Sequence, residues 1–574
     1  MGELKNNKNK EDKEMKVFQG KKVSEKQRSL ILLNICITSI AGGIMATSLT
    51  TALPPIMNDL HIDVNTGQWL TSGFGLFLAI VTPFTSYLIT RFKTKMLYCV
   101  SNLLFIVGLV ICAVSYRFWQ MMLGRIIQGC GTGLMMSMSQ VIILSIYPPN
   151  KIGTAMGWYG FAFSVAPIIA PTLAGILVDT VGWRMIFVIA SVVMGIAFIF
   201  ALYVMENVLT TMNRKFDTIS LIISAFSFGG ITLAIGNVGK YDFVSYQVLL
   251  VLIIGLIATV VFIYRQLHQE LPFLDLRILK DRKFRISTIA TFVLQLTILG
   301  NAIIFPIYVQ QIKHKSATIS GLAILPGSIA SAFLSPLAGK IYDKIGVKFL
   351  YFGGSLSLAI SGLLIYFVNI NTSIWVVSVI NILRCCAIAL FNMPVFTWGM
   401  GSIPKNRTSD ATALNNSIRS VGGALGSALF VSVLTKVASI VGKSKENPDM
   451  FGFNVVYLIM SILGFMIVFI GIYGMRKAEK EDKAKAEIEA SRALEEKNID
   501  KKHVISDENT KSNSNNIDIV IDEIEKNTEG NKKINNNEEK SDSETVINDD
   551  SISDKSSENT TENNSEIDVI EKKE

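Results

Sequence analysis

Val81–Tyr98 (VTPFTSYLITRFKTKMLY) and Leu334–Tyr351 (LSPLAGKIYDKIGVKFLY) lie 253 positions apart and repeat one pattern. Each contains the end of one apolar run, a short basic turn and the start of the next apolar run. A repeat at this distance, in a chain made mostly of long apolar runs, indicates a polytopic membrane protein built from two related halves. Secondary transporters commonly have this design and work by rocking one half against the other.

Fourteen apolar runs are long enough to cross a hydrocarbon core, which takes about 20 helical residues. The chain is 50% hydrophobic and 17% charged, and nearly every run is apolar on all sides. A large soluble helical protein would show charged faces opposite its apolar faces, so the pattern predicts an all-α membrane protein. We expect spans at about 29–50, 68–90, 96–115, 118–147, 155–178, 185–206, 217–237, 245–266, 286–311, 318–340, 347–367, 372–398, 411–438 and 451–475.

Three further pairs recur in the same order at nearly the same offset: Pro54 with Pro306, Arg125 with Arg384, and Ser164 with Ser420. They define two six-span halves and leave the seventh and eighth spans between them. We therefore expect a basic N-terminal segment (1–28), a first half (29–206), two extra spans with a linker (207–285), a second half (286–475) and an acidic tail (476–574). Both the N-terminal segment and the distal tail are too polar to form a packed core.

Charge is divided unevenly along the chain. Residues 476–574 carry 17 Lys and Arg against 28 Asp and Glu, whereas the preceding residues carry 37 against 18. The basic residues concentrate in alternate loops, which predicts a plasma-membrane protein with both termini cytoplasmic. They indicate topology and lipid contact rather than nucleic-acid binding. The tail is either an idle solvated extension or a regulatory, partner-binding segment.

Four stretches carry motifs: ALPPI (Ala52–Ile56), LGRIIQGCGTG (Leu123–Gly133), APIIAPTLAG (Ala166–Gly175) and GKIYDKIGVK (Gly339–Lys348). In this order they resemble the end of the first span, the fourth-span Arg motif, the fifth-span antiporter motif and the turn motif of the major facilitator superfamily. With fourteen spans, the resemblance extends to the superfamily's drug:proton antiporter branch and covers about 29–475. It implies two six-helix halves plus two extra central helices, in a bacterial exporter that works by alternating access.

The turn motif joins two spans in very few residues. Gly339 and Gly346 permit a tight backbone, Asp343 can cap a helix, and Lys348 holds the turn at the cytoplasmic face. We interpret the turn as a conformational latch, with a plain connector as the alternative. In the first half, Ser86, Thr90 and Lys93 replace the two glycines and the acid, so only basic residues such as Arg91 remain.

Arg125 lies inside an apolar span, where an arginine costs about 2.5–3.5 kcal/mol and therefore lines a cavity or finds partners. Gln128 and Gln140 follow on the same helix, and Arg384 is the symmetry mate in the twelfth span. These residues either bind polar groups of the substrate and tune proton exchange, or bond backbone carbonyls of neighbouring helices. The structural alternative weighs more for Arg384, because its surrounding motif is poorer.

The fifth span combines Gly157 and Gly160 with Pro167, Pro171 and Gly175. Small residues let helices approach closely in lipid, so we expect this span to form part of the interface on which the halves rock. Flexible and aromatic side chains suit varied apolar ligands. The candidate cavity residues of this kind, with two asparagines, are Met45, Met135, Met136, Phe161, Asn301, Phe305, Tyr308 and Asn392.

No carboxylate lies at mid-membrane depth in the predicted spans. Members of the branch commonly carry an Asp in the first span, and Met45 stands at the matching position. A buried acid is a natural proton carrier and attracts cationic drugs. We therefore expect a neutral, zwitterionic or anionic substrate with Arg125 as its counter-charge, and proton coupling through an acid at the end of a span, a charge-linked Arg site or the substrate itself.

Four classes of function fit the spans to different degrees. The first is a monomeric exporter of lipophilic drugs that exchanges them for protons. The second exports an endogenous metabolite, peptide or lipid precursor on the same scaffold, and the third is a non-transporting sensor that signals through the acidic tail. An enzyme is the least favoured, because the spans hold no nucleophile constellation, cofactor pattern or metal-ligand spacing.

Overall fold

The computed structural model describes residues 16–18, 23–212, 216–237, 245–270, 272–442 and 447–478, and five single residues beyond them. The chain divides into two compact units, Met1–Lys483 and Ala484–Glu574, and the first contains all the helices discussed below. Of the second unit the structure describes Ala484, Glu487 and Ser491, so the predicted acidic tail lies almost wholly outside the described residues.

Six long helices form the first half and match the first six predicted spans. They are α2 (Glu25–Leu60), α3 (Val64–Arg91), α4 (Thr94–Ala113), α5 (Phe118–Ile146), α6 (Ile152–Thr180) and α7 (Arg184–Val204). The first begins four residues before the predicted run, where the Ser24 side chain caps it by accepting from the Gln27 N–H at 3.3 Å. It continues through Pro54 and Pro55 and ends at Leu60.

The second half repeats this order. It comprises α11 (Arg282–Ile307) with its π-helical continuation η3 (Tyr308–Ile312), α12 (Ala317–Ile345), α13 (Val347–Tyr366), α14 (Ile374–Met400), α15 (Thr408–Val441) and a last helix, Pro448–Ala478. Short 3₁₀ turns, η2 (Leu276–Lys280) and η4 (Lys405–Arg407), precede α11 and α15. The repeated stretches of sequence form the tight α3–α4 and α12–α13 turns, and Gly346 has a φ of +79°, which favours glycine. We call the end of the bundle with these turns the turn end.

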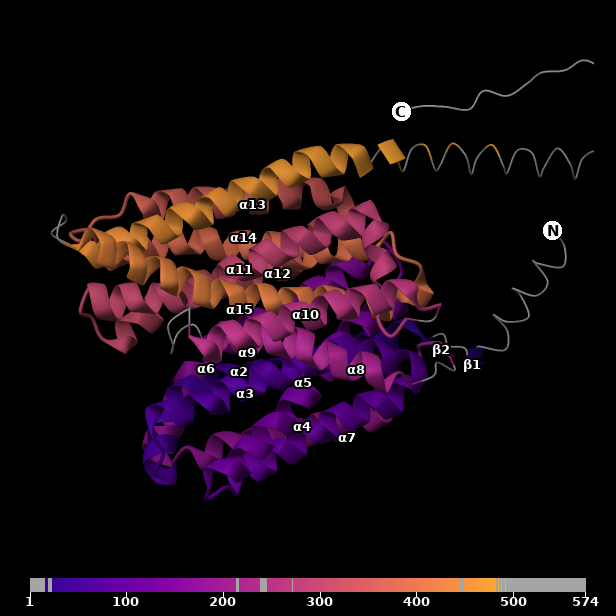
Figure 1. Cartoon of the computed structure of the whole chain (residues 1–574). Helices are drawn as coiled ribbons and strands as arrows, with labels where there is room; N and C mark the ends of the chain where they lie inside the picture. The colour runs from indigo at the N-terminus through magenta and orange to yellow at the C-terminus, as the bar shows by residue number, and fades with distance from the viewer. Residues whose placement is uncertain are drawn as a thin grey trace, which may run out of the picture. The chain divides into compact units, whose positions relative to one another are not determined.

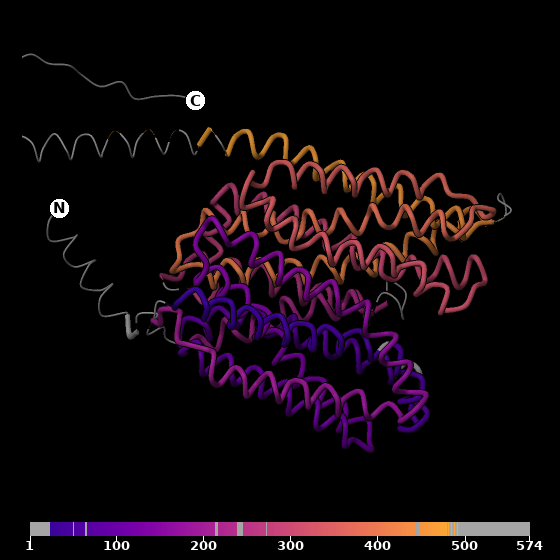
Figure 2. Tube along the Cα trace, turned by 180° about the vertical axis from the view of Figure 1, so that it is seen from behind, coloured from indigo at the N-terminus to yellow at the C-terminus, as the bar shows by residue number. Residues whose placement is uncertain are grey.

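The two extra spans lie between the halves in the chain. The helix α8 (Thr218–Ser224), the π-helix η1 (Ala225–Gly229) and α9 (Gly230–Asn237) form one continuous span, and α10 (Tyr246–His268) forms the next. Among the described residues, fourteen helices are thus long and apolar enough to cross a membrane, as predicted. Contacts of η1 with α3 and of α9 with both α3 and α15 place the extra spans over the line where α3 and α15 meet (Figures 1 and 2).

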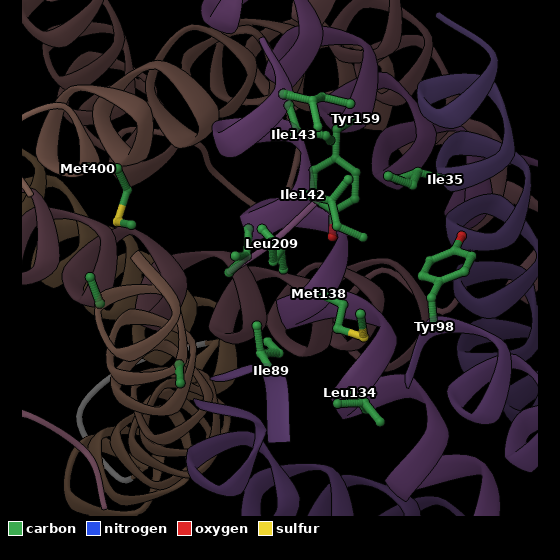
Figure 3. Packing of buried hydrophobic residues seen from close by; sticks show 14 of the residues in the cluster. Ile35, Ile89, Tyr98, Leu134, Met138, Ile142, Ile143, Tyr159, Leu209 and Met400 are labelled. Carbon is green, nitrogen blue, oxygen red and sulfur yellow. The ribbon is translucent and has the colours of Figure 1, made fainter. Parts of the chain in front are cut away.

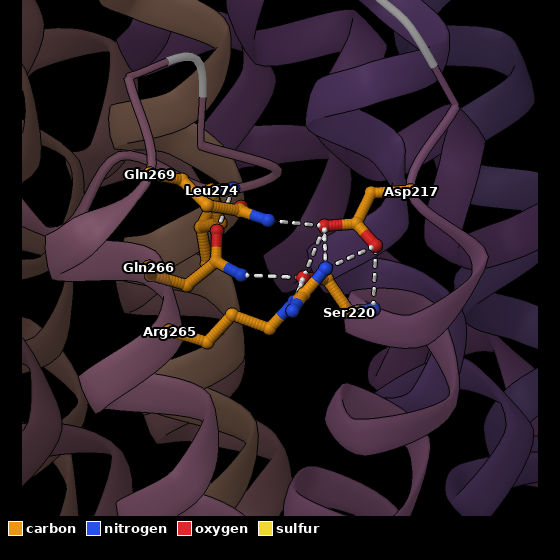
Figure 4. Close-up of polar contacts among 6 residues, drawn as sticks. All are labelled: Asp217, Ser220, Arg265, Gln266, Gln269 and Leu274. Carbon is orange, nitrogen blue, oxygen red and sulfur yellow. Dashed lines mark hydrogen bonds and ion pairs between the residues drawn. The ribbon is translucent and has the colours of Figure 1, made fainter.

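A polar cluster joins the two extra spans at their ends (Figure 4). Asp217 caps α8 by accepting from the Ser220 N–H at 3.0 Å, and its carboxylate also accepts from Arg265 at 3.1 Å and Gln269 at 2.7 Å. Gln266 donates to the Ser220 hydroxyl at 2.9 Å and accepts from the Leu274 N–H at 3.0 Å. The cluster therefore fixes the linker before α11 to the extra spans.

A large apolar cluster spans both halves (Figure 3). It contains Tyr98, Met138 and Tyr159 from the first half together with Phe396 and Met400 from the second. Burial of these side chains holds the two halves together.

A two-stranded antiparallel sheet pairs β1 (Lys16–Phe18) with β2 (Thr211–Met212). The sequence did not predict this sheet, because both strands are very short and lie in polar segments.

Candidate substrate cavity and the junctions between the halves

Arg125 is fully buried within the first half. Its Nε donates to the Leu70 carbonyl at 3.0 Å, its Nη1 donates to Gln128 Oε1 at 2.7 Å, and the guanidinium lies 4.3 Å from the centroid of the Phe74 ring. Gln128 in turn donates to Cys112 Sγ at 3.4 Å. These contacts join α5 to α3 and α4 and give Arg125 a structural role, while its buried Nη2 has no partner among the described residues.

Arg384 is equally buried but has different partners. Its Nη2 donates to the Thr297 carbonyl at 3.0 Å and approaches Met460 Sδ at 3.3 Å, and its guanidinium lies 5.8 Å from the Tyr457 ring centroid. The two symmetry-related arginines thus hold different helices together, each inside its own half.

Most of the other predicted cavity residues pack inside one half. In the second half, Tyr457 donates to Asn301 Oδ1 at 2.6 Å, while Tyr308 stacks on Phe453 with 4.3 Å between ring centroids and meets Phe305 at 6.4 Å. Met45 and Met135 belong to an apolar cluster of the first half.

Phe161 lies edge-on to the exposed Trp158, and Asn392 is half-buried on α14. The structure therefore does not bring the predicted cavity residues together into one site.

A cavity of about 480 Å³ lies between the halves, and we call it the seam cavity. Helices α3, α5, α9, α11 and α15 contribute its walls. Its lining residues are Thr71, Ser72, Gly75, Leu78, Ala79, Met136, Thr232, Ile235, Gly236, Gln295, Leu299, Asn416, Arg419, Ser420, Ala424 and Ser427. Of the predicted site residues, only Met136 lines it directly.

Arg419 is the charged residue of the seam cavity. It is 7% exposed, its Nη2 donates to Gln295 Oε1 at 3.2 Å, and its buried Nη1 has no partner among the described residues. One turn before it, Asn416 donates across the halves to Gln140 Oε1 at 2.9 Å and lies 3.5 Å from Ser137 Oγ. Gln140 is thereby the second predicted residue associated with this cavity.

Sequence reasoning missed Gln295, Asn416 and Arg419. The signal for Arg419 was available, because it is an arginine inside a predicted apolar run and directly precedes the Ser420 landmark of the repeat. The internal repeat pairs Arg125 with Arg384, which marks both as candidates. It does not mark Arg419, because the equivalent residue in the first half is the apolar Phe163.

At the turn end, α6 and α12 form the first junction between the halves. Asp343 on α12 accepts from the Gly153 and Thr154 N–H groups at 2.7 Å each, and from the Thr154 hydroxyl at 2.6 Å. These donors lie in the first turn of α6, where the helix dipole favours an anion. The predicted latch therefore reaches across to the other half.

Glycines allow the close approach of α6 and α12. A Cβ added to Gly339 would lie 2.2 Å from the Gly153 carbonyl oxygen, and one added to Gly157 would lie 2.7 Å from the Ser335 carbonyl oxygen. Gly160 meets Met393 of α14 in the same way at 3.0 Å.

Other residues of the predicted conformational motifs lie elsewhere. Pro167 and Pro171 are exposed, and a Cβ added to Gly175 would meet no atom within 4 Å, whereas Ser164 of the same helix lies 3.5 Å from the Ser331 hydroxyl of α12. Arg91 and Lys348 are exposed at the turn end.

The second junction joins α3 to α15. Ser86 on α3 donates to Asp410 Oδ1 in the first turn of α15, and Asp410 is fully buried. Thr90, which stands where the second half has Asp343, bonds the carbonyls of Ser86 and Tyr87 on its own helix at 3.0 Å each. The acid that the turn motif lacks in the first half is thus supplied by the opposite helix.

Two six-helix halves with a cavity between them are typical of secondary membrane transporters. A family model of the Major Facilitator Superfamily matches residues 35–427, and the chain belongs to this superfamily. It is a multi-pass membrane transporter and not an enzyme, as the sequence predicted.

Curated relatives are bacterial transporters. The chain is 34% identical to the uncharacterized MFS-type transporter YcnB of Bacillus subtilis over 77% of its own length and 95% of that protein. It is 33% identical to the lincomycin resistance protein LmrB of the same species, covering 73% and 88%, and 25% identical to the multidrug export protein EmrB of Escherichia coli, covering 74% and 83%. These similarities place the chain close to the fourteen-span drug efflux branch.

Among solved structures, the human organic anion transporter MFSD10 (TETRAN) has the same fold. The TM-score is 0.56 at 13% identity, with coverage of 78% of this chain and 100% of that one. At this identity the likeness concerns the fold alone.

Proposed function

We propose that this protein exports lipophilic drugs or related small molecules across the bacterial plasma membrane by alternating access, in exchange for protons. The seam cavity carries this proposal, because it lies between the halves while the first junction packs them tightly together at the turn end. The basic loops predict that this end faces the cytoplasm, where close packing of α6 against α12 would restrict access from that side. The names of LmrB and EmrB support drugs as cargo.

A second candidate is export of an endogenous neutral or anionic metabolite, peptide or lipid precursor, with atypical or no proton coupling. The chemistry of the seam cavity favours it over export of cationic drugs. Arg419 has an unpartnered Nη1, and the described lining includes no Asp or Glu that would attract a cation. Either candidate works as a monomer in the bilayer, with both termini cytoplasmic.

Proton exchange, where present, would use Asp410, the end-of-span acid that is fully buried between α3 and α15. A carboxylate at a junction between the halves can link its protonation to the separation of these helices. Asp410→Asn would then abolish acceleration of flux by a pH gradient while leaving substrate exchange at equal pH intact. Unchanged gradient dependence in this variant would exclude Asp410 from coupling.

The deciding experiment measures flux in proteoliposomes with and without a pH gradient, after a growth-inhibition panel on a deletion strain has selected compounds. We expect selected neutral or anionic compounds to move against their gradient when protons flow in the opposite direction. Strong gradient-driven export of a permanent dication would overturn the preference for neutral and anionic cargo. Unaltered drug sensitivity of the deletion strain would favour the endogenous-substrate candidate.

A further inference from the structure

An apolar groove of about 220 Å³ lies beside the seam cavity, between α9, α10 and α15. Its walls include Ala234 and Ile235 of α9, Val248 and Leu252 of α10, and Leu429 of α15. We call it the tail groove. Leu429 is 44% exposed, and the outer face of α10 is also apolar and exposed, so the groove lies on the side that faces lipid.

Ile235 lines both the seam cavity and the tail groove. The residue before it in the chain, Ala234, lines the tail groove, and the residue after it, Gly236, lines the seam cavity. A Cβ added to Gly236 would meet no atom within 4 Å. At this point of α9, Ile235 therefore borders both spaces.

The seam cavity offers a site for an anionic group. The buried Nη1 of Arg419 has no partner among the described residues, and Gln295 orients the same guanidinium through Nη2. No Asp or Glu is found among the described residues that line either space. A buried guanidinium without a carboxylate gains most from an oxyanion, which accepts charge-assisted hydrogen bonds.

We propose that the seam cavity and the tail groove together bind an amphiphilic anion, with its oxyanion head on Arg419 and its hydrocarbon chain past Ile235 in the groove. This inference rests on the proposed export function and names the class of substrate. It also gives the first extra span a role: α9 forms the divide between the head site and the tail site, and movement of Ile235 opens a lateral path from the bilayer.

Binding of radiolabelled probes to the full chain in phosphatidylcholine nanodiscs tests the inference. The probes are dodecanoate, the neutral dodecanamide and the short-chain butyrate, with empty nanodiscs subtracted. We expect dodecanoate to bind at least tenfold more tightly than dodecanamide, because hydrogen bonds to a charged group contribute about ten- to hundredfold. It should exceed butyrate by more, since each buried methylene adds about fourfold.

Variants separate the head site from the tail site. Arg419→Gln should weaken dodecanoate about ten- to hundredfold and leave dodecanamide unchanged, whereas Arg419→Lys should retain most of the preference for the acid. Ile235→Trp should weaken dodecanoate at least tenfold and spare butyrate. Ala428→Leu, on the α15 wall of the groove and outside the seam cavity, provides a second obstruction of the tail site if the tryptophan variant does not fold.

Leu250→Trp is the matched control, because Leu250 is 55% exposed on α10 and does not line the groove. Equal affinity for dodecanoate and dodecanamide, or unchanged dodecanoate affinity in Arg419→Gln, would overturn the head site. Equal losses in Ile235→Trp and Leu250→Trp would overturn the tail site.

These measurements need no gradient, so they are independent of transport. Drug flux without dodecanoate binding would refute this inference alone, and binding without flux of any compound would refute the export function alone.

Discussion

The two junctions at the turn end are related by the internal repeat, yet they are built differently. In the α6–α12 junction, Asp343 on the turn-motif helix meets Thr154 on the opposite helix. The internal repeat relates Asp343 to Thr90 and Thr154 to Asp410, and these two residues lie in the α3–α15 junction. The acid and the hydroxyl residue have therefore exchanged sides, and Ser86, in place of Gly339, is the residue that bonds the acid.

The exchange changes how closely the helices approach. The first junction has glycine against glycine, and its acid accepts backbone N–H groups at the start of α6. In the second junction a serine replaces the glycine, and further along α3 and α15 the seam cavity opens between them. Arg419 lies nine residues after Asp410, or about 13 Å along the helix. The α3–α15 junction is thus the less closely packed of the two. It borders the proposed substrate site, and the extra spans lie over it.

Blocking the tight junction should have the largest effect. Gly339→Leu would push a side chain into the Gly153 carbonyl, and overpacking of this kind costs about 1–3 kcal/mol or forces the helices apart. We expect flux in proteoliposomes to fall more than tenfold, because the turn end cannot close.

The control is Gly353→Leu on α13, since a Cβ there meets no atom within 4 Å. Normal flux in Gly339→Leu would show that tight closure of this junction is dispensable.

Neutralising each acid tests whether the two junctions differ in strength. Asp343→Asn should lower the free energy of unfolding by about 1.5–3 kcal/mol, because the charged acceptor of three hydrogen bonds is lost. Asp410→Asn should cost less, about 0.5–1.5 kcal/mol, since an amide oxygen still accepts from Ser86. Denaturant titration of both variants in one detergent gives the comparison, and equal losses would remove the distinction.

Asp217 helps to hold together the two extra spans, which lie over the α3–α15 junction. Burial alone would raise the pKa of this carboxyl, but hydrogen bonds from Ser220, Gln269 and Arg265 outweigh it and hold the pKa well below its usual range. The stabilisation is therefore present above the unfolded pKa of about 4 and is lost as pH falls further.

We expect Asp217→Asn to cost about 1 kcal/mol at pH 7 and to remove this acid dependence. Thermal unfolding between pH 7 and pH 3 measures both effects. An unchanged pH profile in the variant would assign the acid sensitivity to other groups.

The smallest effect should come from the pair at the opposite end of the first half, away from both junctions. Asp59 accepts from Arg184 Nη1 at 2.5 Å and from Trp183 Nε1 at 3.1 Å, and the Arg184 hydrogen bond lowers the pKa of its carboxyl. The Asp59 side chain is 46% exposed, so solvent screens the pair. Asp59→Asn should cost under about 1 kcal/mol, and a loss as large as that of Asp343→Asn would contradict this ranking.

Much of the fold followed from local features of the sequence. The fourteen spans were predictable because each run is apolar on all sides, and a helix is the structure that satisfies its own backbone hydrogen bonds in lipid. The two halves followed from the repeat, and Asp343 was predicted as a latch from the turn motif. The site was less accessible, because Arg125 and Arg384, which the repeat singled out, proved to pack within their own halves.

The sequence by itself determined the class of fold, the number of spans and the pairing of the halves, because hydrophobic length and repeat spacing are one-dimensional properties. Only the tertiary structure decided that Asp343 pairs with Thr154 and Ser86 with Asp410, and that Arg419, Gln295 and Ile235 meet around one cavity. The physical reason is that a span apolar on all sides carries little signal about which face meets which neighbour. Contacts between residues more than a hundred positions apart depend on helix packing, and that packing selects one face of each helix.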